Sequence, residues 1–310
     1  MLRRSAPSLV ISGVLLLSGC AVPGAAAAVA SHKIGSRTVA AAPPVATSVA
    51  SKAAAVPNLQ TVTLTSVWNF RDVAGNDNGL SLGNGQYMAR GVVYRSGKLA
   101  SLSSSEAKVL SGLGITDVFD LRSPSVAERT PDEAIDGATN HLVNLFAGDS
   151  ASGGDKSTVE GAQEHMRAIY RQFVASEAQR DTLAVLLEDI AVADGPVLVH
   201  CTAGKDRTGW VAAMLQYIAG ATDKAVMAEY LASNDYRAEL VQKDYEKTLR
   251  ADGTTEADIE LAGDVVAASY LQAGLDEMTQ RYGDVDGYLQ DGLGLTDAQL
   301  EQLRSKLRAG

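Results

Sequence analysis

Cysteine is almost absent from this chain of 310 residues, which contains only Cys20 and Cys201. Cys20 ends an apolar leader and is expected either to leave with that leader or to be blocked by lipid, so a structural disulfide between the two thiols is excluded. One unpaired thiol, Cys201, then remains in the mature chain. In an oxidising compartment such a thiol is unusual, and it draws attention to the segment that carries it.

Three other features are missing. The formal net charge is −10, so the chain lacks the basic excess that a nucleic-acid partner requires. The apolar run at residues 9–17 is too short to span a bilayer as a helix. No group of His, Cys and carboxylate residues has the spacing of metal ligands, so neither a metal nor a cofactor is predicted. The composition is that of a globular protein.

The N-terminus has the pattern of an export signal. "MLRR" is a basic start, a short apolar stretch follows, and "LLSGC" resembles the lipobox of bacterial lipoproteins, in which the cysteine, here Cys20, is lipidated. The alternative is an ordinary secretory signal that is cut after Ala30. We predict a signal peptide at 1–20 and an exported protein. The protein is expected either to be anchored at the outer face of the cell membrane or to be secreted. In the first case the N-terminal lipid would be its only contact with the membrane.

The rest of the chain divides into a linker and one domain. Residues 21–57 are rich in Ala, Pro, Ser and Thr and cannot form a core, so they are predicted to be a flexible linker. Residues 58–310 are predicted to form one domain of unknown oligomeric state. Apolar runs predict strands at 90–96, 115–123, 141–146 and 196–200. Helices are predicted at 103–114, 160–177, 178–193, 207–218, 234–251 and 256–282, with a last helix opened by Thr296 and Gln299.

This alternation of strands and helices predicts an α/β fold. We expect a central, mostly parallel sheet with helices on both faces and a helical C-terminal region packed on it. The loop at 147–161, "AGDSASGGDKSTVEG", is longer than an ordinary connection, and we interpret it as a lid.

The stretch "PVLVHCTAGKDRTGWVAAML" (196–215) places Cys201 between a buried strand and a helix. Open α/β sheets bind ligands at the carboxyl ends of their strands, and backbone N–H groups at a helix start form an anion site. Gly204 allows the left-handed backbone that such a loop needs. Arg207 can bind two phosphoryl oxygens with its planar guanidinium. The same positive field lowers the pKa of a cysteine thiol, so Cys201 is predicted to be a nucleophile.

The loop also carries a family resemblance. "HCTAGKDRTG" is similar to the signature of cysteine-dependent protein-tyrosine and dual-specificity phosphatases, and its Lys-Asp pair resembles the secreted bacterial group of that family. The segments "WNFRDVAG" (68–75), "YRSGKL" (94–99), "LGITDVFDLRS" (113–123), "YLASND" (230–235) and "YGDVDGYLQDGLGLT" (282–296) resemble further blocks of the group in the same order. The resemblance covers residues 60 to 308.

The resemblance implies metal-independent hydrolysis of phosphate monoesters through a cysteinyl-phosphate. Cys201 would be the nucleophile, and Arg207 with the loop residues Thr202, Ala203, Gly204, Lys205 and Asp206 would bind phosphate. Thr208 would help the thiolate to leave, and His200 would orient the loop. Either Asp120 or Asp206 would be the general acid. We favour Asp120, because it ends a strand at the same sheet edge and matches the family aspartate in "DLR".

The implied substrate is a protein phosphorylated on tyrosine, and the hypothesis extends to phosphoserine, phosphothreonine and phosphoinositides because Lys205 adds a second cation. An inert phosphate-binding pseudophosphatase is the alternative, although such members usually lose the Cys or the Arg. A sulfur-transfer enzyme of the rhodanese kind is a third hypothesis, but its cysteine loop is normally shorter. "NFRDV", with Asn69, Arg71 and Asp72, is predicted to lock the N-terminal strand to the core rather than to act in the site.

Overall fold

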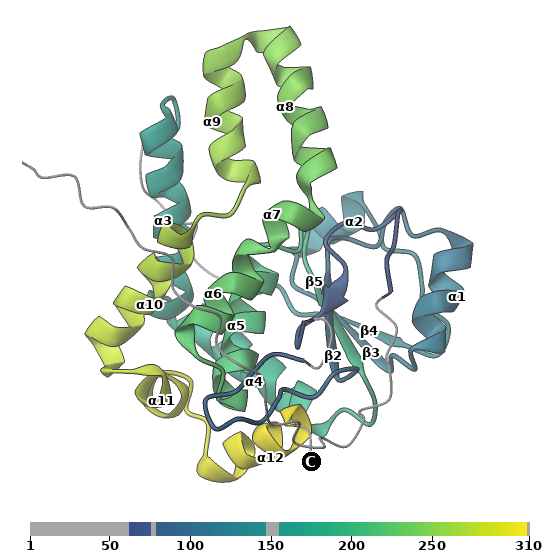
Figure 1. Ribbon diagram of the computed structural model, residues 1–310, viewed down its shortest axis with the longest axis vertical. Helices are drawn as coiled ribbons and strands as arrows, with labels where there is room; N and C mark the ends of the chain where they lie inside the picture. Colours follow the sequence, from purple (N-terminus) through teal and green to yellow (C-terminus); the bar gives the residue numbers. More distant parts are fainter. Residues whose placement is uncertain (1–61, 76–78, 147–154, 309–310) are drawn as a thin grey trace, which may run out of the picture. The chain divides into compact units, whose positions relative to one another are not determined.

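The computed structural model describes residues 62–75, 79–146 and 155–308 of the chain (Figure 1). The predicted signal peptide at 1–20, which includes Cys20, and the predicted linker at 21–57 lie outside the described residues. Most of the loop interpreted as a lid does so too, since only 155–161 of it is described.

A five-stranded sheet forms the centre of the described domain. Its strands, in the order β1-β2-β5-β3-β4, are β1 (Arg71–Asp72), β2 (Val93–Ser96), β5 (Val197–His200), β3 (Asp117–Asp120) and β4 (Thr139–Leu142). β1 pairs antiparallel to β2, and the other pairs are parallel. Parallel strands buried on both faces are continuous apolar runs, and "VLV" in the central strand β5 has that form. The predicted α/β fold is confirmed.

The helices cover both faces of this sheet. In chain order they are α1 (Ser104–Gly112), α2 (Pro124–Arg129), α3 (Val159–Ala175), α4 (Glu177–Val192), α5 (Arg207–Ala219), α6 (Asp223–Leu231), α7 (Ser233–Tyr236), α8 (Ala238–Asp252), α9 (Thr254–Asp264), α10 (Ala268–Tyr282), α11 (Val285–Gly287), a π-helical turn (Tyr288–Gly292) and α12 (Asp297–Leu307).

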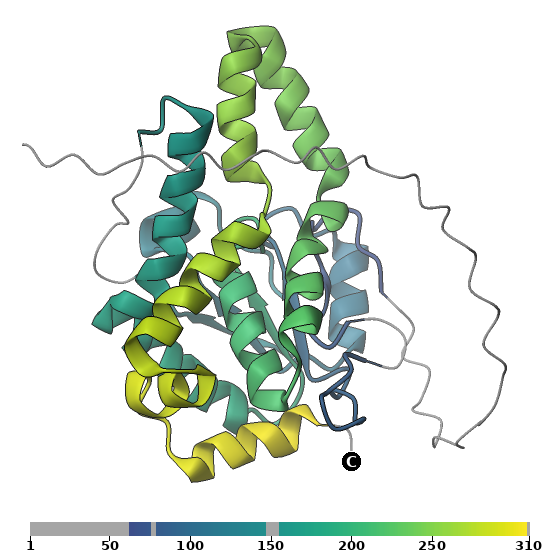
Figure 2. The ribbon, with the colours of Figure 1, turned by 60° about the vertical axis from the view of Figure 1, so that its left-hand side comes forward.

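The side chains of β5 alternate between two apolar cores. Leu198 packs with Leu110 of α1, whereas Val197 and Val199 pack with residues of α3, α4, α5 and the C-terminal helices around the buried Trp210. Figure 2 shows α10 lying along α3, so the C-terminal region packs on the domain as predicted. α8 and α9 pack against each other as an antiparallel pair that extends beyond the carboxyl end of the sheet (Figure 1).

The sequence signals for helix starts are reproduced in detail. Ser103 caps α1 and its hydroxyl accepts from the Glu106 amide, while Thr296 and Gln299 form the reciprocal capping box of α12. α5 ends at Gly220, whose φ of 97° gives the left-handed turn that often closes a helix.

Two predicted helices are wrong in their continuity. The segment 234–251 is divided at Arg237 into α7 and α8, and the segment 256–282 is divided at 265–267 into α9 and α10. The second break has a clear cause, because the side chain of Asn234 accepts from the N–H of Val266 and donates to its carbonyl, both at 2.9 Å. A distant amide thus replaces helical hydrogen bonds, and no local pattern reveals it.

The predicted position of strand β4 is also wrong by a few residues. The apolar run 141–146 suggests a strand there, but β4 occupies 139–142 in register with β3, and Leu142 on this edge strand is exposed. Asn144, with a φ of 48°, turns the chain away so that Leu145 enters the core.

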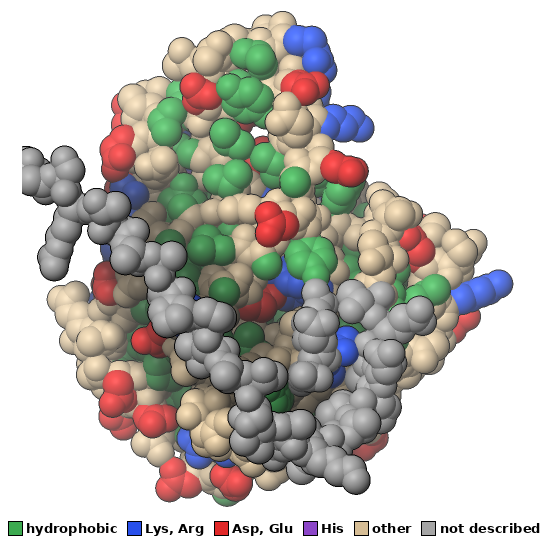
Figure 3. Space-filling view, viewed as in Figure 1, with side chains coloured by type: hydrophobic (Ala, Val, Ile, Leu, Met, Phe, Trp, Pro, Cys, Tyr) green, Lys and Arg blue, Asp and Glu red, His purple; other side chains and the backbone are tan. Residues whose placement is uncertain are grey.

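Charged side chains of the described residues are not gathered in one patch on the face shown in Figure 3. On the face shown in Figure 3, acidic and basic side chains of the described residues are scattered over different elements. Within 62–75, 79–146 and 155–308, no helix is both long and apolar enough to cross a membrane.

Candidate active site

The loop 201–206 connects the end of β5 to the start of α5, at the carboxyl ends of the parallel strands. His200 is the last residue of β5 and lies in register with Asp120, the last residue of β3. Arg207 begins α5, and helix starts leave backbone N–H groups without helical partners. The strand order therefore brings Cys201, Arg207 and Asp120 together at the carboxyl end of the sheet.

The carbonyl groups of the loop are held from outside. The carbonyl of Thr202 accepts from the N–H of Lys98 at 3.1 Å, and the carbonyls of Ala203 and Gly204 accept from Asn69 Nδ2 at 3.3 and 2.8 Å. In a trans peptide unit the N–H points away from the C=O, so the N–H groups of residues 203–205 face the opposite side. Among the described residues, none accepts a hydrogen bond from these three amides. They form a nest suited to an anion.

Glycine at position 204 is required by two constraints. Its φ is +69°, a left-handed conformation that costs other residues energy. A Cβ at this position would lie 2.3 Å from the carbonyl oxygen of Ser96 and 2.6 Å from the N–H nitrogen of Gly97. Because both are backbone atoms, the loop can approach β2 this closely only with glycine.

The thiol of Cys201 lies at the base of this loop and is 2% exposed. Burial raises its pKa, but the positive charge of Arg207 and the neighbouring hydroxyl and amide of Thr208 together lower it more strongly. The pKa of Cys201 is therefore below that of an ordinary cysteine, despite an opposing effect of Asp206. These contacts favour ionisation of a buried thiol beside an anion site.

Arg207 is held in place by contacts on three sides. Nη1 donates to the carbonyl of Leu121 at 3.1 Å, Nη2 lies 3.5 Å from the hydroxyl of Thr202, and the guanidinium stacks over the ring of Phe146 at 4.7 Å. Such a cation–π contact restricts the side chain without neutralising its charge.

Asp206 is held at the end of the loop by two donors. Tyr170 of α3 donates to Oδ1 at 3.1 Å, and Lys205 donates to Oδ2 at 2.7 Å. The side chain of Lys205 is only 4% exposed, so its charge is directed at Asp206. The Asp206 side chain keeps 20% exposure, and its charge acts on the thiol of Cys201. Its negative charge therefore lies close enough to the thiol to oppose ionisation of Cys201.

Asp120 has a different environment. Its two oxygens accept from Nε and Nη2 of Arg122 at 2.7–3.0 Å, and one of them also accepts from the backbone N–H of Arg122. The same Nη2 pairs with Asp132. Arg122 is fully buried, so Asp120 is a partner in a closed ionic cluster.

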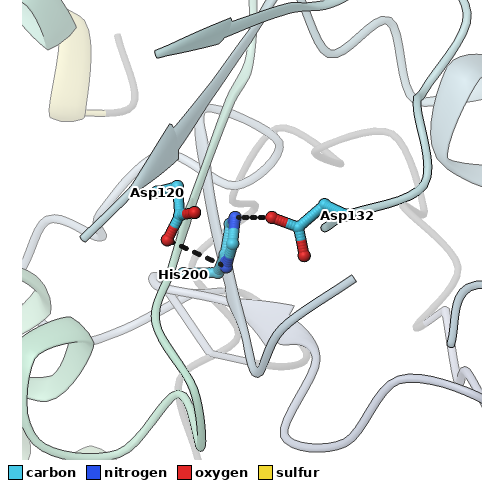
Figure 4. A group of neighbouring side chains, drawn as sticks. All are labelled: Asp120, Asp132 and His200. Atoms are coloured by element: carbon cyan, nitrogen blue, oxygen red, sulfur yellow. Dashed lines mark ion pairs between the residues drawn. The ribbon is translucent and has the colours of Figure 1, made fainter. Parts of the chain in front are cut away.

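His200 lies between the two carboxylates of this cluster (Figure 4). Its Nε2 is 3.3 Å from Asp132, its Nδ1 is 3.9 Å from Asp120, and Nδ1 also lies 3.3 Å from the carbonyl oxygen of Cys201. Asp120, Asp132 and His200 offer three atoms within 4.8 Å that could hold a metal ion. The guanidinium of Arg122 already pairs with both carboxylates, so a metal would have to displace a buried arginine.

Several residues around the loop were not assigned to the site from the sequence. Asp132 and Tyr170 belong to no motif, and Glu229 is one carboxylate in a helix of mixed composition. In the structure Glu229 is buried and pairs with Arg71 at 2.6 Å and Arg95 at 2.7 Å. A buried Arg-Glu-Arg group beneath the loop has no local signature, because its members are distant in sequence.

Comparisons with known proteins identify the family of this chain. A model described as "Tyrosine phosphatase family" matches residues 62–309. Triple specificity protein phosphatase PtpB of Mycobacterium tuberculosis is 32% identical over 279 residues, which cover 79% of this chain and 98% of that protein. A protein of Cupriavidus necator that is named as a tyrosine-protein phosphatase without a stated activity is 31% identical over 259 residues, which cover 81% of this chain and 90% of that protein.

A crystal structure of TpbA from P. aeruginosa is 18% identical and covers 70% of this chain and 96% of that chain. Its TM-score is 0.26, which is too low to relate the two sites. The family model and the sequence relatives carry the assignment: this chain belongs to the tyrosine phosphatase family.

Proposed function

We propose that this tyrosine phosphatase hydrolyses phosphotyrosine in two steps through a cysteinyl-phosphate on Cys201. The thiolate attacks phosphorus, an S–P bond forms, and the bond from phosphorus to the phenolic oxygen breaks. Arg207 and the amides of the loop stabilise the equatorial oxygens. Water then attacks the phosphocysteine, and Cys201 leaves as a thiolate beside Thr208. The observation that carries this proposal is a thiol of lowered pKa at the start of a loop with three amides that donate to none of the described residues.

We further propose that Asp206, rather than Asp120, transfers the proton. Asp120 accepts a bidentate contact from the buried guanidinium of Arg122, whose other partner is Asp132, so its carboxylate is engaged as an ion-pair partner. Asp206 belongs to the loop and accepts hydrogen bonds from the hydroxyl of Tyr170 and the ammonium group of Lys205. Its negative charge raises the pKa of the Cys201 thiol. In the first step Asp206 protonates the leaving phenolic oxygen, and in the second it takes a proton from water. Asp120 then serves to position Arg122.

Leaving-group dependence tests this assignment. General acid catalysis contributes about 10²–10⁴-fold, and it matters most when the leaving oxygen is basic. Asp206→Asn should therefore lose far more rate on phenyl phosphate than on p-nitrophenyl phosphate. Asp120→Asn should lose a similar factor on both substrates and lower the free energy of unfolding. The reverse pattern would return the acid role to Asp120, and robust turnover by Cys201→Ser would overturn the whole mechanism.

Substrate breadth is a separate question. PtpB is named a triple specificity phosphatase, which motivates a panel of phosphotyrosine, phosphoserine, phosphothreonine and phosphoinositide substrates. Because Lys205 is engaged by Asp206, it supports additional phosphates poorly, and we expect phosphotyrosine to be the preferred substrate. Phosphate binding without any turnover on this panel would support the pseudophosphatase alternative, although Cys201 and Arg207 are both present.

We also propose that the protein is exported and anchored through a lipid on Cys20. The basic start, the short apolar stretch and "LLSGC" support this. Expression in bacteria with labelled palmitate should label the wild type and not Cys20→Ser. A mature N-terminus at residue 31 would instead indicate simple secretion.

A further inference from the structure

Asn69 has an unusual backbone conformation for a buried residue. Its φ is +62°, and among the described residues only one other non-glycine position, Asn144, has a positive φ. Asparagine tolerates the left-handed region better than most residues, but the conformation still needs a compensating contact. Asn69 is 1% exposed, so those contacts are within the protein.

The side-chain amide of Asn69 has a fixed orientation. Its Oδ1 accepts from Nη1 of Arg71, which also donates to the Asn69 carbonyl at 3.3 Å. The NH₂ group is therefore directed at the phosphate loop, where it donates to the carbonyls of Gly204 and Ala203. Arg71 is in turn held by Glu229 at 2.6 Å.

The carbonyl of Gly204 receives a second donor from the same buried group. Nη2 of Arg95 donates to it at 2.7 Å, while Nη1 of Arg95 donates to the other oxygen of Glu229. One loop carbonyl is thus held by two donors, both connected to the single carboxylate of Glu229. Neither Asn69 nor Arg95 donates a hydrogen bond to the thiol of Cys201. Both therefore act on the conformation of the loop.

This arrangement matters because position 204 is glycine. Glycine adopts positive and negative φ with similar ease, so the peptide between Gly204 and Lys205 could reverse at low cost. Reversal would point a carbonyl oxygen, instead of the N–H of Lys205, at a bound anion. Two donors on the outer side oppose that reversal before any ligand arrives, which is the preorganisation that anion stabilisation requires.

We propose that Asn69 is a positioning residue that keeps the Gly204–Lys205 peptide in its anion-binding orientation, with Arg95 as the second donor. The proposal concerns the phosphate affinity of the loop and rests on the proposed phosphatase function only through the identity of the anion. It gives the "NFRDV" segment a role in the site, beyond locking the N-terminal strand.

The experiment measures binding of inorganic phosphate by calorimetry, using the full chain in a Cys201→Ser background so that no chemistry occurs. Asn69→Gly removes the donor and retains a residue suited to positive φ. Asn69→Asp retains the size and the contact with Arg71 but cannot donate to Gly204. The matched control is Asn144→Gly, which also replaces an asparagine at positive φ and makes no hydrogen bond to the loop. Thermal unfolding verifies that each variant is folded.

We expect Asn69→Gly and Asn69→Asp to weaken phosphate binding about tenfold. This is the order expected when one hydrogen bond is lost and the Gly204–Lys205 peptide is held less firmly. In the Cys201 background, kcat/KM on p-nitrophenyl phosphate should fall by at least the same factor. Asn144→Gly should leave both quantities within twofold. Phosphate binding within twofold of the parent in either folded Asn69 variant would overturn the positioning role. Absence of phosphotyrosine hydrolysis by the wild type would refute the proposed function instead.

Discussion

Replacing Gly204 with alanine separates the two demands that the loop makes on this position. A left-handed backbone costs alanine about 1–2 kcal/mol relative to glycine. The added Cβ would also lie 2.3 Å from the Ser96 carbonyl oxygen, at least 1 Å inside ordinary van der Waals contact, which begins at 3.4 Å. Since Ser96 belongs to the buried strand β2, the loop rather than the strand must move.

A displacement of about 1 Å at a catalytic centre can cost about 10²-fold in rate. We therefore expect Gly204→Ala to reduce kcat/KM on p-nitrophenyl phosphate by roughly that factor. The control is Gly114→Ala, at a φ of +73° with no atom within 4 Å of the new Cβ. It should lose the same 1–2 kcal/mol in urea denaturation and retain full activity.

Two results would refute this reasoning. If Gly204→Ala kept kcat/KM within threefold of the wild type, the close approach of the loop to β2 would not govern catalysis. If Gly114→Ala lost as much activity as Gly204→Ala, the backbone conformation alone would explain the effect.

Three further predictions concern charge. The rate of alkylation of Cys201 by iodoacetamide should show a midpoint below the pH of an ordinary thiol, and Arg207→Ala should raise it; an unchanged midpoint would contradict the assigned cause. Glu229→Gln should lower the free energy of unfolding by about 3–5 kcal/mol, because it leaves two buried arginines unpaired, whereas Glu246→Gln at an exposed pair should change it by less than about 1 kcal/mol. Burial raises the pKa of Asp72 to about 6 against two backbone hydrogen bonds that lower it, so the folded state holds this proton more tightly than the unfolded state. The contribution of Asp72 to stability should fall by roughly 2–3 kcal/mol as the pH rises from about 4 to 7. A wild-type curve parallel to that of Asp72→Asn would refute this.

The sequence predicts the architecture and the nucleophile because both depend on local patterns. A buried strand followed at once by a helix requires only an apolar run, a glycine and a helix start, all visible in residues 196–215. The capping signals at Ser103 and Thr296 are local in the same way, and the structure reproduces them.

The sequence does not predict contacts between distant residues. The break before α10 depends on Asn234, which lies 32 residues away from Val266. The ionic cluster around Asp120 likewise includes Asp132, because Arg122 pairs with both carboxylates. No sequence motif connects Asp132 with the strand that carries Asp120. The sequence favours Asp120 over Asp206 as the acid on strand position and family match, and the contacts that distinguish their environments come from distant residues.

The two edges of the sheet differ in how readily another chain could extend them. β1 consists of two residues, and both side chains are occupied: Arg71 by Glu229, and Asp72 by the N–H groups of Ala74 and Gly91. So short an edge gives a foreign strand little backbone to pair with. β4 is twice as long and ends in Leu142, which is 51% exposed. Self-association through sheet extension should therefore begin at β4, and a lysine at position 142 should oppose it.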